Sequence, residues 1–354
     1  MSEKRDVFFV GAGFSKEYGL PLMADLLDAI SQFNVESHKF LMDYLWLSDE
    51  EKKKIQLDDV LQEDLKKINN ILSGVDSHIK NDIEKIIHHL DKIDKELSKS
   101  LLVFMGWVIY LNTYNYFQKT KTDSRNKKWH YKKLLVNSNV VITTNYDNLI
   151  EREHPKTNTP NFTLPNKSCG WDGKEYPLLL KLHGGHAYVK LNGSNEIIHI
   201  YTDENKQFIS YKEMKNNAGN LGNDQFPQGS PSHEQIIVPP FFDKSSLYEK
   251  FKSYIDKMFD VAGEELDKNS RIFILGYSLP EADQKVINLL KERIKTNEVY
   301  IINPSQLNST EKYLKIFPKG CKYLQMTAGD FVSYYPDNLQ KCFEKAIEIK
   351  CLNH

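Results

Sequence analysis

The chain has 354 residues, of which 40% are hydrophobic and 12% aromatic, and this composition excludes a mainly disordered protein. Its 47 Lys and Arg residues balance 48 Asp and Glu residues, which argues against direct binding of nucleic acid. The longest strongly apolar stretch, 101–111, is too short to span a bilayer and predicts a buried core helix. Because residues 1–13 also lack a signal-peptide pattern, we expect a cytoplasmic protein without membrane association.

The N-terminal region has the order strand, glycine turn and helix that opens an α/β fold. Residues 6–10 are mostly β-branched or aromatic and predict a buried strand, after which 11–15 form a tight turn. Leucine and isoleucine recur with helical spacing in 21–32, which predicts an amphipathic helix.

Residues 35–133 differ from the rest of the chain in composition. Charged residues are dense at 49–99, and apolar residues recur there every three to four positions, which predicts amphipathic helices. We expect a helical insertion at 35–133 that packs against an α/β domain formed by 1–34 and 134–354. The basic run at 119–133 is typical of a solvated loop, with contact to a partner or a phosphate as the alternative.

The rest of the chain alternates strands with helices and predicts a Rossmann-like parallel sheet. Residues 186–235 are an exception, because they combine short strands with loops rich in Gly, Asn and Pro. The predicted strands are 140–144, 178–182, 271–275, 299–302 and about 321–326, and the predicted helices are 245–267, about 281–295 and about 337–349.

Polar or glycine residues directly follow four of these strands. In an open parallel sheet, ligands bind outside the carboxyl ends of the strands, and glycines let the backbone approach a pyrophosphate. Each motif alone also has a purely structural explanation. In the order of the four motifs that follow, these are a tight turn, a helix N-cap, a histidine with a structural role and an ordinary turn. The motifs are Gly11-Ala12-Gly13-Phe14-Ser15, Thr143-Thr144-Asn145-Tyr146-Asp147, Lys181-Leu182-His183-Gly184 and Gly276-Tyr277-Ser278.

The order and spacing of these motifs resemble those of a sirtuin-type NAD-binding domain. The resemblance covers most of the chain outside the helical insertion. Each motif is short, but the ordered set is specific. The set also includes Gly19-Leu20-Pro21, Leu279 after the last motif, Ile301-Ile302-Asn303 and Gly329-Asp330.

The resemblance implies a role for each matching position. Asn145 would hold the nicotinamide ribose and an ordered water near the anomeric carbon, and Asp147 would contact the nicotinamide carboxamide. His183 would be the general base acting on water or a ribose hydroxyl, a task for which histidine is suited near neutral pH. The other implied NAD-binding residues are Gly11, Ala12, Gly13 and Ser15 at the diphosphate, Thr144 in the Asn145 motif, Gly276 and Ser278 at phosphate and ribose, Asn303 at the adenine ribose and Asp330 at the adenine side.

The chain departs from the sirtuin deacylases in two places. Leu22-Met23-Ala24 stands where those enzymes have Asp-Phe-Arg, and the 4 cysteines lack the spacing of their zinc module. The chain is more similar to bacterial sirtuin-like NAD hydrolases of antiphage defence, which deplete NAD when a sensor triggers them. Its architecture also resembles versions that work with a separate HerA-type hexameric ATPase.

The resemblance therefore implies an NAD+ glycohydrolase that releases nicotinamide and ADP-ribose, with NAD as the substrate and no metal. A homo-oligomer with a slow resting state is expected, because a toxic activity has to be held off when it is not needed. Two alternatives stay open: an NAD-dependent protein deacylase, and a non-enzymatic sensor of NAD or ADP-ribose.

Overall fold

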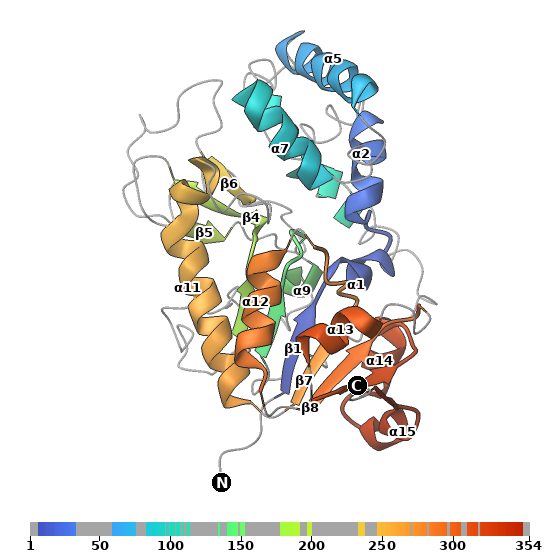
Figure 1. Ribbon diagram of the computed structural model, residues 1–354. Coiled ribbons are helices and arrows are strands. Elements are labelled where there is room, and N and C mark those ends of the chain that lie inside the picture. Colours follow the sequence, from blue (N-terminus) through green and yellow to red (C-terminus); the bar gives the residue numbers. More distant parts are fainter. Residues whose placement is uncertain are drawn as a thin grey trace.

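The computed structural model describes the chain in segments, which Figure 1 draws as coloured ribbons. They are 6–32, 59–75, 83–95, parts of 97–113, 134, 140–147, 149–152, 178–191, 197–199, 233–237, 246–269, 271–281, 283–295, 298–305, 310–317 and 319–349. The basic run at 119–133 lies outside the described residues.

A seven-stranded sheet runs through the molecule in the order β10-β9-β8-β7-β1-β2-β3. Its neighbouring strands are parallel, except that β10 pairs antiparallel with β9. The chain extends the sheet from β1 to one side, returns to β7 and then extends it to the other side, which is the strand order of a Rossmann-like α/β fold. The strands are β1 (Asp6–Val10), β2 (Val140–Thr143), β3 (Leu178–Lys181), β7 (Arg271–Leu275), β8 (Glu298–Ile302), β9 (Cys321–Leu324) and β10 (Ile347–Ile349).

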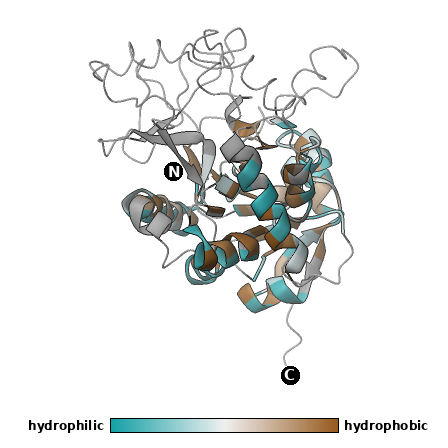
Figure 2. Cartoon of the chain, turned by 90° about the horizontal axis from the view of Figure 1, so that it is seen from above, coloured by the Kyte–Doolittle hydropathy of each residue, from teal (hydrophilic) through white to brown (hydrophobic). Residues whose placement is uncertain are grey.

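Side chains alternate between the two faces of this sheet. Val7 and Phe9 of β1 pack in one apolar cluster, and Phe8 and Val10 pack in the other, so β1 is buried on both faces, as parallel strands usually are. The helices around the sheet carry both brown and teal residues in Figure 2, as amphipathic helices do. The helices that contribute to the first cluster include α2 (Met23–Ser31), α5 (Asp59–Gly74), α7 (Ile83–Ile93), α11 (Ser246–Lys268), α12 (Gln284–Arg293) and α13 (Thr310–Ile316). Those that contribute to the second include α1 (Ala12–Lys16), α14 (Ala328–Tyr334) and α15 (Leu339–Phe343), and the short helix α9 (Leu149–Arg152) contributes to both.

The described helices of the 35–133 region share the main apolar core. α5 and α7 lie beside α2, beyond the end of the sheet toward which β1 runs (Figure 1). Ile68 of α5 and Ile86 and Leu90 of α7 are fully buried in the same cluster as Val7 and Phe9. The described apolar residues within 101–109 are helical and also join this cluster, which confirms the predicted core helix.

A second, three-stranded antiparallel sheet follows β3 directly. Its order is β5-β4-β6, and its strands are β4 (Gly184–Leu191), β5 (Ile197–His199) and β6 (His233–Ile237). Only Leu182 and His183 separate the end of β3 from the start of β4, so this histidine lies at the junction of the two sheets.

The C-terminal region differs from the sequence prediction. The single helix predicted at about 337–349 is a short helix, α15, followed by the edge strand β10. The strand forms because Ile347 and Ile349 pair with Tyr323 and Cys321 of β9, and a local pattern does not reveal this long-range pairing. Helices α13 and α14 were also not predicted from the sequence, because they have only 7 residues each.

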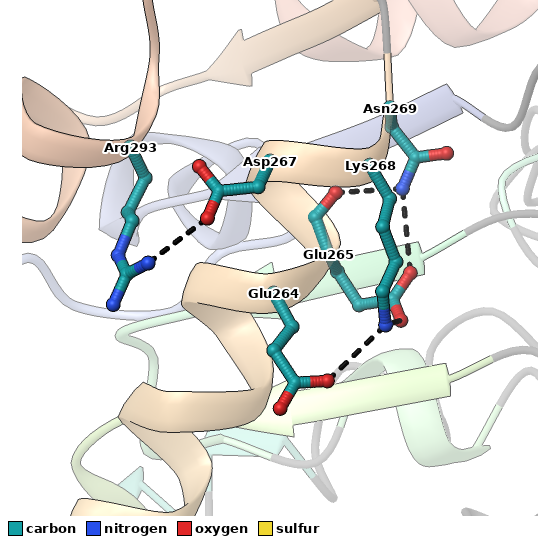
Figure 3. Close-up of polar contacts among 6 residues, drawn as sticks. All are labelled: Glu264, Glu265, Asp267, Lys268, Asn269 and Arg293. Atoms are coloured by element: carbon teal, nitrogen blue, oxygen red, sulfur yellow. Dashed lines mark hydrogen bonds and ion pairs between the residues drawn. The ribbon is translucent and has the colours of Figure 1, made fainter.

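Polar contacts gather at the C-terminal end of α11 (Figure 3). The side-chain amide of Asn269 donates to the main-chain oxygen of Glu265 (2.7 Å) and so occupies a carbonyl at the end of α11. Asp267 forms an exposed ion pair with Arg293 of α12 (2.9 Å), which links the two helices at the surface.

An ion pair between a buried aspartate and a partly exposed arginine joins β1 to β7 at their amino ends. Asp6 and Arg271 face each other in register, and Arg271 donates from Nε to Oδ1 (2.7 Å) and from Nη2 to Oδ2 (2.9 Å). The hydroxyl of Tyr335 donates to the same carboxylate (2.8 Å). Because Asp6 is only 4% exposed, this bidentate pair is screened far less than a surface pair.

Replacing the buried carboxylate tests its contribution to stability. We expect Asp6→Asn to lower the free energy of unfolding by about 3 kcal/mol, because Arg271 then loses its buried counter-charge. The matched surface change, Asp267→Asn, breaks the exposed pair with Arg293 and should cost less than about 1 kcal/mol. Urea unfolding measures both, and equal losses would contradict the assignment.

Candidate functional site

Four strand ends meet at the carboxyl edge of the large sheet. Val10 of β1 is in register with Thr143 of β2 and with Leu275 of β7, and Thr143 is in register with Lys181 of β3. The segments that follow these strands therefore lie side by side. The amide and the imidazole predicted to act in catalysis are each two residues beyond their strand, so they share one edge of the sheet.

The side chains of three predicted residues form one hydrogen-bonded group. Asn145 donates from Nδ2 to the main-chain oxygen of Gly11 (3.0 Å) and to Oγ of Ser15 (2.9 Å). Ser15 in turn donates from its hydroxyl to Oδ2 of Asp147 (2.7 Å). The main-chain N–H of Asn145 donates to Oγ1 of Thr143 (3.0 Å), which orients the start of the turn. The β1 and β2 turns are thereby locked together.

The amide oxygen of Asn145 stands out within this group. The residue is 6% exposed, and Nδ2 has two partners, but Oδ1 has no hydrogen-bond partner in the part of the chain that the structure describes. Buried polar atoms are nearly always paired, because an unpaired acceptor loses the free energy of hydration. The arrangement therefore fixes the orientation of a buried acceptor that has no partner among the described residues.

Asp147 and Lys181 support the turn after β2. Oδ1 of Asp147 accepts from the main-chain N–H of Leu149 (3.1 Å), two residues further on, at the start of α9 (Leu149–Arg152). The buried ammonium of Lys181 donates to the main-chain oxygen of Asp147. A Cβ at Gly185 would lie 2.8 Å from Cε of Lys181, so the second glycine of the pair leaves room for this side chain.

His183 is buried between aromatic rings and one carboxylate. Its Nε2 is 3.2 Å from Oδ2 and 3.2 Å from Oδ1 of Asp283, at the start of α12. Tyr277 donates from its hydroxyl to Oδ2 of the same carboxylate (2.6 Å). The rings of Tyr146 and Phe259 lie 6.3 Å and 6.4 Å from the imidazole, centroid to centroid. No role was predicted from the sequence for Tyr277 or Asp283, although both belong to the segment that follows β7.

The glycines of the β1 turn pack directly on the turn after β7. The main-chain N–H of Gly13 donates to the oxygen of Gly276 (2.8 Å), and a Cβ at Gly11 would lie 2.6 Å from Cα of Tyr277. Ala12 begins α1 between these two glycines. The glycines are therefore required by contact between two backbones at the point where the strand order reverses.

Four further predicted residues lie at this edge: Thr144, Ser278, Asn303 and Asp330. The main-chain N–H of Thr144 donates to the oxygen of Val10 (3.3 Å). Asn303 accepts at Oδ1 from the main-chain N–H two residues further on (3.0 Å), and Asp330 donates its main-chain N–H to Thr327 (3.0 Å). Ser278 is exposed in the β7 turn. These residues do not join the hydrogen-bonded group of Asn145 within the described chain.

A carboxylate that the sequence analysis missed connects α1 to α14. Glu17 follows α1 and accepts from the main-chain N–H groups of Ala328 (2.7 Å) and Gly329 (2.9 Å) at the start of α14. A carboxylate at a helix N-terminus is stabilising, because it pairs free N–H groups and opposes the positive end of the helix dipole. This contact is hard to predict from the sequence, because Glu17 and the start of α14 are far apart along the chain.

Two classes of feature are absent from the described segments. No three His, Cys, Asp or Glu side chains among the described residues gather closely enough to hold a metal ion. None of the described helices is both long enough and apolar enough to cross a membrane.

Comparison with known proteins assigns no family to the chain. No family model matches it. A β-galactosidase from Actinobacillus pleuropneumoniae is 26% identical over 168 residues, which cover 44% of this chain. The alignment spans only 16% of the length of that protein.

Several solved sirtuin structures show a distant likeness. A structure of Sir2Tm bound to a propionylated peptide is 14% identical, with 94% of this chain and 92% of that chain covered and a TM-score of 0.33. A Sir2 complex with a p53 peptide and NAD+ is 13% identical, with coverages of 96% and 95% and a TM-score of 0.37. At these scores the superpositions carry no weight, and the Rossmann-like assignment rests on the strand order.

Adding a methyl group at Gly276 tests the contact between the two turns. Gly276 has φ +60°, and a Cβ there would lie 2.3 Å from the main-chain N of Phe14. We expect Gly276→Ala to lower the free energy of unfolding by about 3 kcal/mol, through strain and overlap. The control is Gly19→Ala. Gly19 has φ +77°, but a Cβ there would meet no atom within 4 Å, so this change should lower the free energy of unfolding by only about 1 kcal/mol. Equal urea midpoints for the two variants would contradict the packing.

A buried phenol beneath the β7 turn predicts a pH dependence of stability. Tyr313 donates its hydroxyl to the main-chain oxygen of Tyr277, and burial raises the pKa of Tyr313 well above its usual range. Above about pH 10 the unfolded chain releases this proton while the folded chain keeps it, so the free energy of unfolding falls as the pH rises.

The variant Tyr313→Phe isolates this effect. Near pH 7 it should be less stable than the parent by about 1 kcal/mol, because the oxygen of Tyr277 loses its donor. Above about pH 10 that difference should shrink, since the variant has no phenol to ionise at this position. Urea unfolding measures the difference in free energy of unfolding between parent and variant. If that difference stays constant from pH 7 to pH 11, folding does not protect this phenol from ionisation.

Proposed function

We propose that this chain is an NAD+ glycohydrolase that cleaves the bond between nicotinamide and ribose. The observation that supports this most is the buried amide oxygen of Asn145, which is oriented but has no partner among the described residues. It lies at the carboxyl edge of the sheet, next to the glycine turn and on the same edge as His183. That edge is where open α/β folds bind their ligands.

The chemistry required of these residues is modest. The C1′–N1 bond breaks with its electron pair going to the nicotinamide nitrogen, and the ribose passes through an oxocarbenium-like state. Oδ1 of Asn145 would accept a hydrogen bond from the water or ribose hydroxyl that approaches C1′. His183 would take the proton that is released when water adds to C1′, giving ADP-ribose. Orientation in a site that restricts water supplies much of the rate.

The remaining predicted residues would hold the rest of the dinucleotide. The N–H groups of Gly11 and Gly13 already donate to Leu275 and Gly276, so these glycines would line the diphosphate site without donating to it. Asp147 would contact the carboxamide. The other proposed binding residues are Ala12, Ser15, Thr144, Gly276, Ser278, Asn303 and Asp330.

We extend the proposal to a role as an NAD-depleting effector in antiphage defence, on the motif resemblance alone. The catalytic unit would comprise 1–34 and 134–354, and the helical insertion at 35–133 would take part in assembly. Because α5 and α7 share the core of the sheet, assembly at the insertion could be transmitted to the site. A homo-oligomer and a HerA-type ATPase in the cytoplasm are the proposed partners, with no metal.

Substitution of the two proposed catalytic residues tests the function. We expect Asn145→Ala and His183→Ala each to slow nicotinamide release from NAD by about 100-fold or more, because each removes a group that acts on the attacking oxygen. Asp267→Asn lies remote from the site and should release nicotinamide at the rate of the parent. Release is quantified by chromatography, with and without a candidate partner protein.

Other results would point elsewhere. Full activity in either alanine variant would refute the proposed mechanism. Nicotinamide release that depends strictly on an acylated peptide would indicate a deacylase, and tight NAD binding without turnover under every partner condition would indicate a sensor.

A further inference from the structure

The carboxylate of Asp283 does not cap the helix that begins next to it, although its position predicts this role. Asp283 is the N-cap residue of α12, where an aspartate ordinarily accepts hydrogen bonds from the first main-chain N–H groups of the helix. Its side chain makes no such capping bond. The carboxylate turns instead toward His183 and Tyr277 and is 2% exposed.

The loop that delivers this carboxylate is strained. It runs from Gly276, with φ +60°, to Asp283, and includes Leu279 with φ +52°. Within the described chain, Leu279 is the only residue other than glycine with a positive φ, a conformation that L-residues rarely adopt. Its side chain is buried, which anchors the loop. Such outliers cluster where a structure holds a functional geometry.

The contacts of the carboxylate are specific. Oδ2 accepts from the hydroxyl of Tyr277 (2.6 Å) and lies 3.2 Å from Nε2 of His183. Oδ1 is also 3.2 Å from Nε2. Tyr277 is itself held from the other side, because its main-chain oxygen accepts from the hydroxyl of Tyr313.

We propose that Asp283 is a positioning residue that fixes the tautomer of His183, so that Nδ1 is the nitrogen that takes the proton. This inference rests on the proposed function, in which His183 is the base. An ionised carboxylate is only an acceptor, so Nε2 has to carry the hydrogen of the neutral ring and the lone pair is on Nδ1. When Nδ1 takes the proton from the attacking water, the carboxylate stabilises the positive ring through the same Nε2–H bond.

Tyr277 secures the carboxylate in this arrangement. Because its hydroxyl occupies Oδ2, the carboxylate cannot rotate freely toward the N–H groups of α12. Removing this hydroxyl should loosen Asp283 but leave the acceptor for Nε2–H in place.

The first test detects the hydrogen bond between His183 and Asp283 by NMR and needs no assay of activity. Isotope-labelled histidine and nitrogen–proton correlation spectra report which ring nitrogen carries the hydrogen, and His183→Ala identifies its signal among the 11 histidines. We expect a strongly deshielded, slowly exchanging proton on Nε2 of His183 in the parent and in Tyr277→Phe, and its loss in Asp283→Ala. The isosteric Asp283→Asn, which keeps an acceptor if Asp283→Ala does not fold, should retain the signal at a less deshielded position. A hydrogen on Nδ1 in the parent, or an unchanged signal in Asp283→Asn, would overturn the proposal.

The second test separates positioning from the reaction. We expect Asp283→Asn to lower kcat for nicotinamide release by about 10-fold with little change in KM, since Asp283 acts through His183. Asp267→Asn is the control for a change of carboxylate to amide. An effect on KM alone would refute the positioning role. If even the parent releases no nicotinamide under any condition, the proposed function fails, while the spectra still decide whether Asp283 fixes the tautomer.

Discussion

The candidate site depends on the contact between two backbones at the centre of the sheet. The turn after β1 and the turn after β7 touch at Gly11, Gly13 and Gly276, with no side chain between them. This contact occurs where the strand order reverses, which is the position at which α/β folds form a crevice. Because the two turns are fixed against each other, every group attached to them keeps a constant position relative to the sheet edge.

Two buried polar groups are built on this contact. Asn145, Ser15 and Asp147 bind the β1 turn to the β2 turn, whereas His183, Asp283 and Tyr277 bind the end of β3 to the β7 loop. Both groups are nearly fully buried, and an unmade hydrogen bond is costly in such surroundings. The two groups therefore give the edge its rigidity. In the first group the amide oxygen of Asn145 has no hydrogen-bond partner among the described residues, and in the second Oδ1 of Asp283 makes only the ion-pair contact with His183.

Much of this arrangement follows from local sequence pattern. The buried strands were predicted because parallel strands covered on both faces are short apolar runs, and the motifs at their ends mark the carboxyl edge. The helices at 246–268 and 284–293 follow from their apolar periodicity. The C-terminal β10 was missed, since its hydrogen bonds come from Tyr323 and Cys321 of β9 and not from its neighbours in sequence.

The sequence by itself determined the residue types at the sheet edge, because glycine, asparagine and histidine directly after apolar strands are visible without a structure. Only the tertiary structure decided how they are partnered. That the glycines accommodate another backbone, that Glu17 caps α14, and that Asp283 faces His183 instead of capping its own helix are all long-range facts. They are set by which strands lie next to one another, since hydrogen bonds between residues 100 or more positions apart leave no local periodicity to detect.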